Sequence, residues 1–239
     1  MKTLFGITTL NQNNYTKQCL QSISACKDIN IELQDDFSKK PKEVKALATM
    51  YGAKFYSKKS GQGVTDSWNR IYRRFKKNNY DACFISNNDI ITTPSAIRQL
   101  IKALTIHPLV APLSSIKSVS GFYEQTTFKY GVADIMANNP FQVGSIQNTL
   151  LRKHLANPYA KLPRFHGFFF GFNRNIISQE YDEKHLFDPS YINIGNEDEL
   201  SRRLTVPPHV VKTAFVFHYK GVTCGTDADG DRNDISRFH

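Results

Sequence analysis

Three short polar side chains, Asn87, Asn88 and Asp89, follow directly after an apolar run at residues 82–85. In an open α/β sheet, ligands bind in the crevice beyond the carboxyl ends of the strands. One carboxylate with amide neighbours suits a hard divalent cation that also carries phosphates, because Mg²⁺ usually takes only one or two protein carboxylates. An isolated tripeptide of this kind is also compatible with an ordinary polar turn. The surrounding sequence must therefore distinguish a cation site from a turn.

Polar clusters or glycines also follow the other strands expected in the first half of the chain. They are Thr8 and Thr9, Asp35 and Asp36, and Gly61 and Gly63. This layout is typical of a nucleotide site, with carboxylates for donors on the base or ribose and glycines where the backbone must approach. The acidic pair has an alternative role in an Asx turn or helix cap. No G-x-G-x-x-G follows the first strand and no P-loop motif occurs, which excludes ordinary dinucleotide and P-loop sites.

The elements that must position these residues alternate regularly. Strands are expected over residues 4–10, 29–33, 53–56 and 82–85, and helices over 15–26, 41–51 and 64–77. This alternation predicts a largely parallel sheet with helices on both faces. After residue 112 the rhythm changes, and residues 113–163 show no clear periodicity. An aromatic strand over 166–172, a helix over 199–204 and a last strand over 213–218 are expected in the remainder.

The composition limits the class of protein. The 239 residues are 40% hydrophobic and 12% aromatic, which is enough for a sizeable core. The net charge of +10 favours a polyanionic partner, namely nucleic acid, an anionic membrane surface or a phosphorylated small molecule. Basic pairs such as Lys58-Lys59 and Arg73-Arg74 are most simply read as solvated surface. No apolar run near 18 residues and no signal peptide occurs, so we expect a cytoplasmic protein.

Seven signals occur in an order that resembles a known family. They are Thr8-Thr9, D-D-x-S at 35–38, G-x-x-x-x-W-N at 63–69, N-N-D at 87–89, G-x-x-x-G at 167–171, E-D at 197–198, and His218. Together they resemble the GT-A glycosyltransferases, specifically the large family 2 of inverting enzymes, over roughly residues 4–220. The resemblance implies an α/β, Rossmann-like nucleotide-diphospho-sugar transferase fold with a mostly parallel central sheet flanked by helices.

The resemblance also implies residue roles at the nucleotide. Thr8 matches the first-strand position whose backbone and side chain meet the base. Asp35 and Asp36 match the acidic pair of which one accepts a hydrogen bond from a pyrimidine N–H, and Asn69 matches an Asn near the nucleotide.

The D-x-D position of the family is occupied here by Asn87-Asn88-Asp89. The sequence departs from the family at its first position, because Asn87 replaces an Asp and leaves Asp89 as the metal ligand. Asn87 can still bond the ribose hydroxyls. The implied cofactor is Mn²⁺ or Mg²⁺, bound with one anionic ligand fewer than usual.

The later motifs are implied to serve the sugar and the acceptor. Gly167 begins the glycine-bearing segment that is expected to lie beneath the donor sugar and the acceptor. A packed aromatic strand is the alternative for this segment. Reading E-D directly gives Asp198 as the catalytic base, whereas counting back from Leu200 gives Glu197; we favour Asp198. An acidic first turn that complements the helix dipole is the alternative for both. His218 matches a late His that joins the metal or the diphosphate, and Lys220 beside it is expected to meet phosphate.

The implied activity is that of a hexosyl- or pentosyltransferase. It moves a sugar with inversion from a nucleoside-diphosphate donor, with UDP favoured, to a hydroxyl of a glycan or other acceptor. We expect one domain over 1–239, with a nucleotide-binding half (1–112), an acceptor and catalytic half (113–224) and a polar tail (225–239). Nucleic acid is not an expected partner, while peripheral attachment to a membrane is allowed. The alternatives are a nucleotidyltransferase and a basic nucleic-acid-binding protein.

Overall fold

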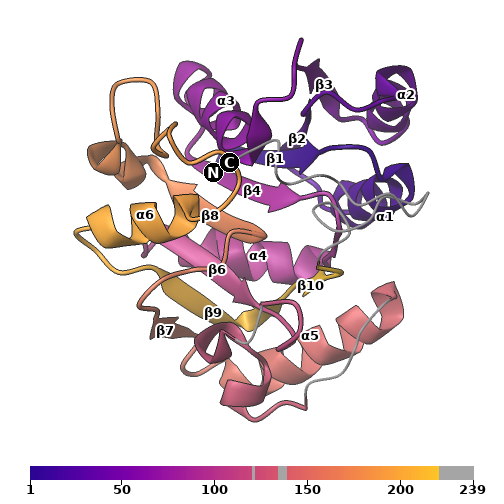
Figure 1. Cartoon of the computed structure of the whole chain (residues 1–239). Coiled ribbons are helices and arrows are strands. Elements are labelled where there is room, and N and C mark those ends of the chain that lie inside the picture. Colours follow the sequence, from indigo (N-terminus) through magenta and orange to yellow (C-terminus); the bar gives the residue numbers. More distant parts are fainter. Residues whose placement is uncertain (120–121, 134–138, 221–239) are drawn as a thin grey trace.

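A computed structural model describes residues 1–119, 122–133 and 139–220, and within them an eight-stranded sheet forms the centre of the molecule (Figure 1). Its strands run in the spatial order β3-β2-β1-β4-β8-β6-β9-β7. They are β1 (Thr3–Thr9), β2 (Ile29–Asp35), β3 (Lys54–Ser57), β4 (Ala82–Asn87), β6 (Leu109–Leu113), β7 (Tyr159–Lys161), β8 (Phe169–Asn173) and β9 (His209–Phe215). Two short strands, β5 (Ile90–Ile91) and β10 (Phe217–His218), pair separately.

Helices cover both faces of the sheet. One face packs against α1 (Asn13–Ser24), α2 (Pro41–Met50) and α4 (Pro94–Ala103), and the other against α3 (Gly63–Lys77), α5 (Pro140–His154) and α6 (Asn196–Arg203). Short 3₁₀ turns lie at η1 (Tyr123–Gln125), η2 (Phe128–Tyr130) and η3 (Arg174–Gln179). Neighbouring strand residues such as Phe169 and Phe170 enter opposite cores, because side chains alternate across a strand. Within the described residues, no helix is long and apolar enough to cross a membrane.

The parallel half of the sheet forms as the sequence predicts. Strand β1 pairs in parallel with both β2 and β4, and β2 pairs in parallel with β3. The register sets Thr8 beside Asn87 and Thr9 beside Asp35. The polar residues that end separate strands therefore do meet at one edge of the sheet.

The second half is less parallel than predicted. Strand β8 runs antiparallel between β4 and β6, and β7 runs antiparallel to β9. The single strand expected over 213–218 is in fact two strands: β9 ends at Phe215, and β10 pairs antiparallel with β5. The pairing of β9 with β6 shifts register between Pro112 and Leu113, within β9 and before this break. As a result, His218 pairs with Ile90, next to Asp89.

Although residues 113–163 show no clear periodicity in the sequence, 15 of them form α5. Asn139 caps this helix by accepting a hydrogen bond from the Gln142 amide at 3.0 Å. Its buried face carries Val143, Ile146, Gln147 and Leu150. The polar Gln147 belongs to that buried face, where it bonds the backbone of β9, and so interrupts the apolar pattern. The tail expected over 225–239 lies outside the described residues.

Candidate functional site

Asp89 and His218 lie side by side where β5 pairs with β10. His218 Nε2 is 3.2 Å from Asp89 Oδ1, and the Tyr219 amide donates to the Asp89 carbonyl at 2.9 Å. The two residues are 1% and 6% exposed. The family resemblance implies that both residues bind the metal. The structure brings them together although they are 129 positions apart in the chain (218 − 89).

The contacts of His218 suggest what belongs between them. Its Nδ1 lies 3.0 Å from the carbonyl oxygen of Ser118, which can only accept, so Nδ1 carries the proton of this bond. In the neutral ring Nε2 is then an acceptor, and it faces the carboxylate oxygen of Asp89, which has no hydrogen-bond partner. Two buried acceptors at this distance require a proton or a cation between them.

A divalent cation fits this position. Neighbouring ligands of an octahedral ion with bonds of about 2.1 Å lie about 3 Å apart, close to the separation of Nε2 and Oδ1. The second nitrogen of a metal-bound His ordinarily bonds a carbonyl or carboxylate, as Nδ1 does with Ser118. Within the described ranges, no group of three or more His, Cys, Asp or Glu side chains is arranged to hold a metal. The remaining ligands would therefore come from water and a bound substrate.

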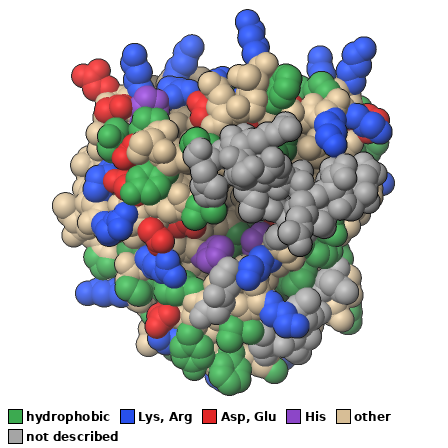
Figure 2. Space-filling model, viewed as in Figure 1, with side chains coloured by type: hydrophobic (Ala, Val, Ile, Leu, Met, Phe, Trp, Pro, Cys, Tyr) green, Lys and Arg blue, Asp and Glu red, His purple; other side chains and the backbone are tan. Residues whose placement is uncertain are grey.

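Gly167 and Phe168, which directly precede β8, contact both this pair and the carboxylate of Glu197. The Phe168 carbonyl accepts from the Asn87 amide at 2.9 Å, and the Phe168 ring stacks on His218 with centroids 4.8 Å apart. The adjacent Gly167 amide lies 3.4 Å from Glu197 Oε1. The predicted metal ligands and a carboxylate of α6 thus flank the same dipeptide. Figure 2 shows histidine side chains gathered near the middle of one face, with acidic and basic side chains beside them.

The structure separates Glu197 from Asp198. Burial raises the pKa of Glu197 above its usual value, and the charge of Asp198 raises it further. Asp198 instead accepts from Arg164 Nη1 at 2.7 Å, and both side chains of that pair are well exposed, at 41% and 50%. The favoured reading of Asp198 as the base therefore finds less geometric support than the alternative, Glu197.

His166 borders the same site. Burial, followed by the nearby charges of His218, Arg164 and Lys220, lowers the pKa of His166 to about 4. These basic groups therefore lie within electrostatic reach of His166. Lys220 ends the described chain in an exposed position at the edge of the site.

Several residues predicted to bind nucleotide make contacts within the protein. Asn88 is fully buried and its amide donates to the hydroxyls of Thr9 and Thr16. The Thr8 hydroxyl donates to the Ser86 carbonyl at 3.2 Å. Asn69 accepts from the amides of residues 186 and 187 and donates back to the carbonyl of 187. These contacts hold the loops around the strand ends, and Asn87 alone of the N-N-D motif is partly exposed.

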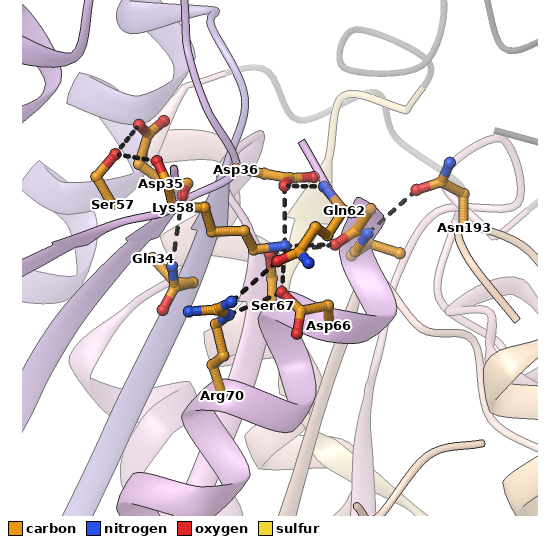
Figure 3. A network of polar contacts seen from close by, with 12 residues as sticks. Gln34, Asp35, Asp36, Ser57, Lys58, Gln62, Asp66, Ser67, Arg70 and Asn193 are labelled. Carbon is orange, nitrogen blue, oxygen red and sulfur yellow. Dashed lines mark hydrogen bonds and ion pairs between the residues drawn. The ribbon is translucent and has the colours of Figure 1, made fainter. Parts of the chain in front are cut away.

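The two aspartates after β2 have different surroundings (Figure 3). Asp35 is fully buried and accepts from the Ser38 amide, the Ser38 hydroxyl and the Ser57 hydroxyl. The Asp35 carboxylate therefore bonds groups of the protein itself. Asp36 is 8% exposed and accepts from the Gln62 amide at 3.1 Å. Of the two, Asp36 is the one placed to meet a ligand.

Sequence reasoning missed three contributors. Lys58, read as solvated surface, is buried between Asp36 and a carboxylate of α3. Arg164 and Ser118 hold Asp198 and His218, respectively. Ser118 and Arg164 lie far from their partners in the sequence, and Lys58 lies 22 positions from Asp36, so no local pattern predicts these contacts.

Replacement of Gly167 by Ala should disturb the site. An added Cβ would lie 2.7 Å from Trp68 Cη2 and 3.1 Å from Glu197 Oε1. We expect turnover of whatever reaction the site performs to fall about 10- to 100-fold, because a misplacement of about 1 Å has effects of this size. Gly144→Ala is the matched control, since its Cβ would meet nothing within 4 Å. Equal turnover of the two variants would argue against a site at Gly167.

Comparison with known proteins gives the same fold. The sequence matches no protein-family model and no curated protein. Among solved structures, the chain is similar to mannosyltransferase PcManGT from Pyrobaculum calidifontis in complex with GDP-Man and Mn²⁺ (TM-score 0.59, 12% identity). It is also similar to GalNAc-T7 with UDP, GalNAc and Mn²⁺ (0.61, 13%) and to S. aureus TarS 1-349 (0.58, 11%).

These alignments cover 91%, 91% and 92% of this chain but only 56%, 44% and 61% of the other three. The chain thus spans about half the length of the proteins it resembles. Over nearly all of its own length, the chain has the GT-A fold of the glycosyltransferases.

Proposed function

We propose that this protein is a metal-assisted inverting glycosyltransferase, which transfers a sugar from a nucleoside diphosphate to an acceptor hydroxyl. The observation that supports the proposal is that His218, paired with Asp89, stacks on Phe168, while Glu197 contacts the adjacent Gly167. A leaving diphosphate needs positive charge, and an attacking hydroxyl needs a base. This arrangement supplies both at one site.

Asp89 and His218 would hold Mn²⁺ or Mg²⁺, whose charge would stabilise the departing diphosphate. The solved structures support a divalent metal, because two of the three contain Mn²⁺ with a nucleotide or nucleotide sugar. Lys220 is exposed beside the site and would add a cationic contact to the phosphates.

Glu197 is the better candidate for the base. Its raised pKa brings it closer to the pH at which it must take a proton, and its carboxylate lies against Gly167. Attack by an activated hydroxyl on the face opposite the diphosphate would invert the anomeric carbon. Asp198, held by Arg164 at the surface, would tune the charge of Glu197 rather than react.

Asp36 would recognise the donor base by accepting from a ring N–H. Uracil and guanine both present such a donor, and the nucleotides in the two solved complexes carry these bases. The sequence motifs favour UDP. Asn87, the partly exposed residue of its motif, would contact the ribose.

A thermal-shift panel of UDP, GDP, CDP and ADP, each with and without Mn²⁺, tests the proposal. A ligand that binds only the folded state stabilises it by RT ln(1 + [L]/Kd), which is about 2.7 kcal/mol at 100 Kd. We expect a Mn²⁺-dependent shift with UDP or GDP, and the matching nucleotide sugar should then be consumed. No shift with any nucleotide would contradict the proposal.

The basic residues of α3, which could suggest nucleic-acid binding, make contacts within the protein. Arg74 donates to the buried Glu32 at 2.6 Å and stacks over Tyr56, and Lys76 pairs with Glu180. A nucleic-acid-binding protein would instead present such residues to the phosphate backbone. Strong, salt-dependent binding of random oligonucleotides would favour that alternative.

A further inference from the structure

Lys58 is a buried cation with a complete set of partners. The residue is 4% exposed, and its ammonium group lies 2.8 Å from Asp36 Oδ1 and 2.9 Å from Asp66 Oδ2. It also donates to the Gly63 carbonyl at 2.8 Å. An ammonium group has three donors and no acceptor, so these three contacts satisfy it fully.

The partners of Lys58 come from two segments, the residue after β2 and the start of α3 (Figure 3). Asp36 follows β2, whereas Gly63 and Asp66 lie in the first turn of α3. The segment that joins β3 to α3 is also tied down, because the Gln62 amide donates to the oxygen of Asp36 that Lys58 contacts. Lys58 therefore fixes both the direction of the Asp36 carboxylate and the loop that faces it.

The same first turn touches the segment that leads to Glu197. The Val64 amide donates to Asn193 Oδ1 at 3.1 Å, and Asn196 donates to the Thr65 hydroxyl at 2.9 Å. Glu197 follows directly. The start of α3 is thus held between the carboxylate proposed to read the base and the helix that carries the proposed catalytic base.

We propose that Lys58 is a positioning residue of the donor site, which aims Asp36 at the nucleobase and holds the loop at 61–63 against it. The inference rests on the proposed nucleotide binding and adds a residue to it. Lys58 acts through Asp36, since its own ammonium is buried and saturated. Without Lys58, two neighbouring carboxylates would repel each other, and Asp36 would turn away from the direction that binding needs.

Lys58→Met tests the inference when donor Kd, KM and kcat are measured with whichever of UDP- or GDP-linked donor the wild type uses. We expect Kd and KM to rise at least tenfold while kcat changes less than threefold. Binding of Mn²⁺ with pyrophosphate should stay as in the wild type, because among the described residues Asp89 and His218 bond each other and Ser118 rather than this network. A general loosening of the fold would instead lower kcat and pyrophosphate binding as well.

Lys59→Met is the matched control, because Lys59 is the exposed neighbour of Lys58 and its substitution removes the same charge. If the single variant does not fold, Lys58→Met combined with Asp66→Asn removes one of the two repelling charges. Its donor Kd should still exceed that of Lys59→Met, because the direct bond from Lys58 to Asp36 is lost, and an equal Kd would refute the role of Lys58. Lys58→Arg should restore part of the affinity.

The outcomes separate the two proposals. If the wild type binds nucleoside diphosphates and Lys58→Met binds them as tightly as Lys59→Met, the role of Lys58 is refuted and the proposed function stands. If the wild type binds no nucleoside diphosphate, the proposed function fails and the role of Lys58 fails with it.

Discussion

Glu197→Gln should reduce sugar transfer by about 10²- to 10⁴-fold, the usual contribution of a positioned general base. The amide keeps the shape of the side chain and its contact with the Gly167 amide, but it cannot take the proton of the attacking hydroxyl. Donor binding should therefore remain close to that of the wild type. Initial rates of transfer and calorimetric titration of the donor measure the two effects separately.

The same variant should be more stable than the wild type. Because burial raises the pKa of Glu197 in the folded state, the wild type loses stability as pH rises through that pKa, whereas a Gln does not ionise. The gain in melting temperature should be small near pH 4 and larger at pH 7. A loss of activity accompanied by this gain is not what a damaged fold produces.

Asp198→Asn is the control for this assignment. Its carboxylate is paired with Arg164 at the surface, so we expect transfer to stay within about tenfold of the wild type. If Asp198→Asn abolished transfer and Glu197→Gln did not, the direct reading of the E-D motif would be right and the assignment to Glu197 wrong.

His218→Phe should remove the effect of Mn²⁺ on nucleotide binding. The phenyl ring keeps the stacking on Phe168 and loses only the nitrogens that face Asp89 and Ser118. Loss of a residue that merely supports a metal ligand costs 10- to 100-fold in affinity or activity, so loss of a ligand should cost at least as much. Asp89→Asn should have the same effect, and calorimetric titration of UDP with and without Mn²⁺ measures both.

His154→Phe, a similar change on α5, is the control and should leave the Mn²⁺ effect intact. Chelation of the metal should reduce wild-type binding to the level of His218→Phe. If His218→Phe retained the full Mn²⁺ effect, the metal would not lie between Asp89 and His218.

The parallel half of the fold could be predicted because its signals are local. Each short apolar run ends in polar residues, and parallel strands joined by helices bring their carboxyl ends to one edge. The pairing of Thr8 with Asn87 and of Thr9 with Asp35 follows directly from that rule. The order of the motifs then indicated the GT-A fold although no single motif was specific.

The remaining features depend on contacts between distant segments. The division of 213–218 into β9 and β10 follows from the antiparallel pairing of Phe217 and His218 with β5, which the apolar pattern does not record. The burial of Lys58 depends on Asp36 and Asp66 closing around it, whereas in the sequence it is one of two adjacent lysines. The proposed preference for Glu197 over Asp198 likewise depends on contacts with Gly167 and Arg164, which lie 30 and 34 positions away in the sequence.

The most direct test of the central claim is a titration with Mn²⁺, followed by the electron paramagnetic resonance signal of the free ion, in the presence and absence of UDP or GDP. If Asp89 and His218 hold a cation that also carries the diphosphate, nucleotide and Mn²⁺ must strengthen each other's binding by the same factor. We expect that mutual effect in the wild type and its loss in His218→Phe. If Mn²⁺ does not change the affinity of the wild type for UDP or GDP, the claim that Asp89 and His218 hold a cation that carries the diphosphate is contradicted.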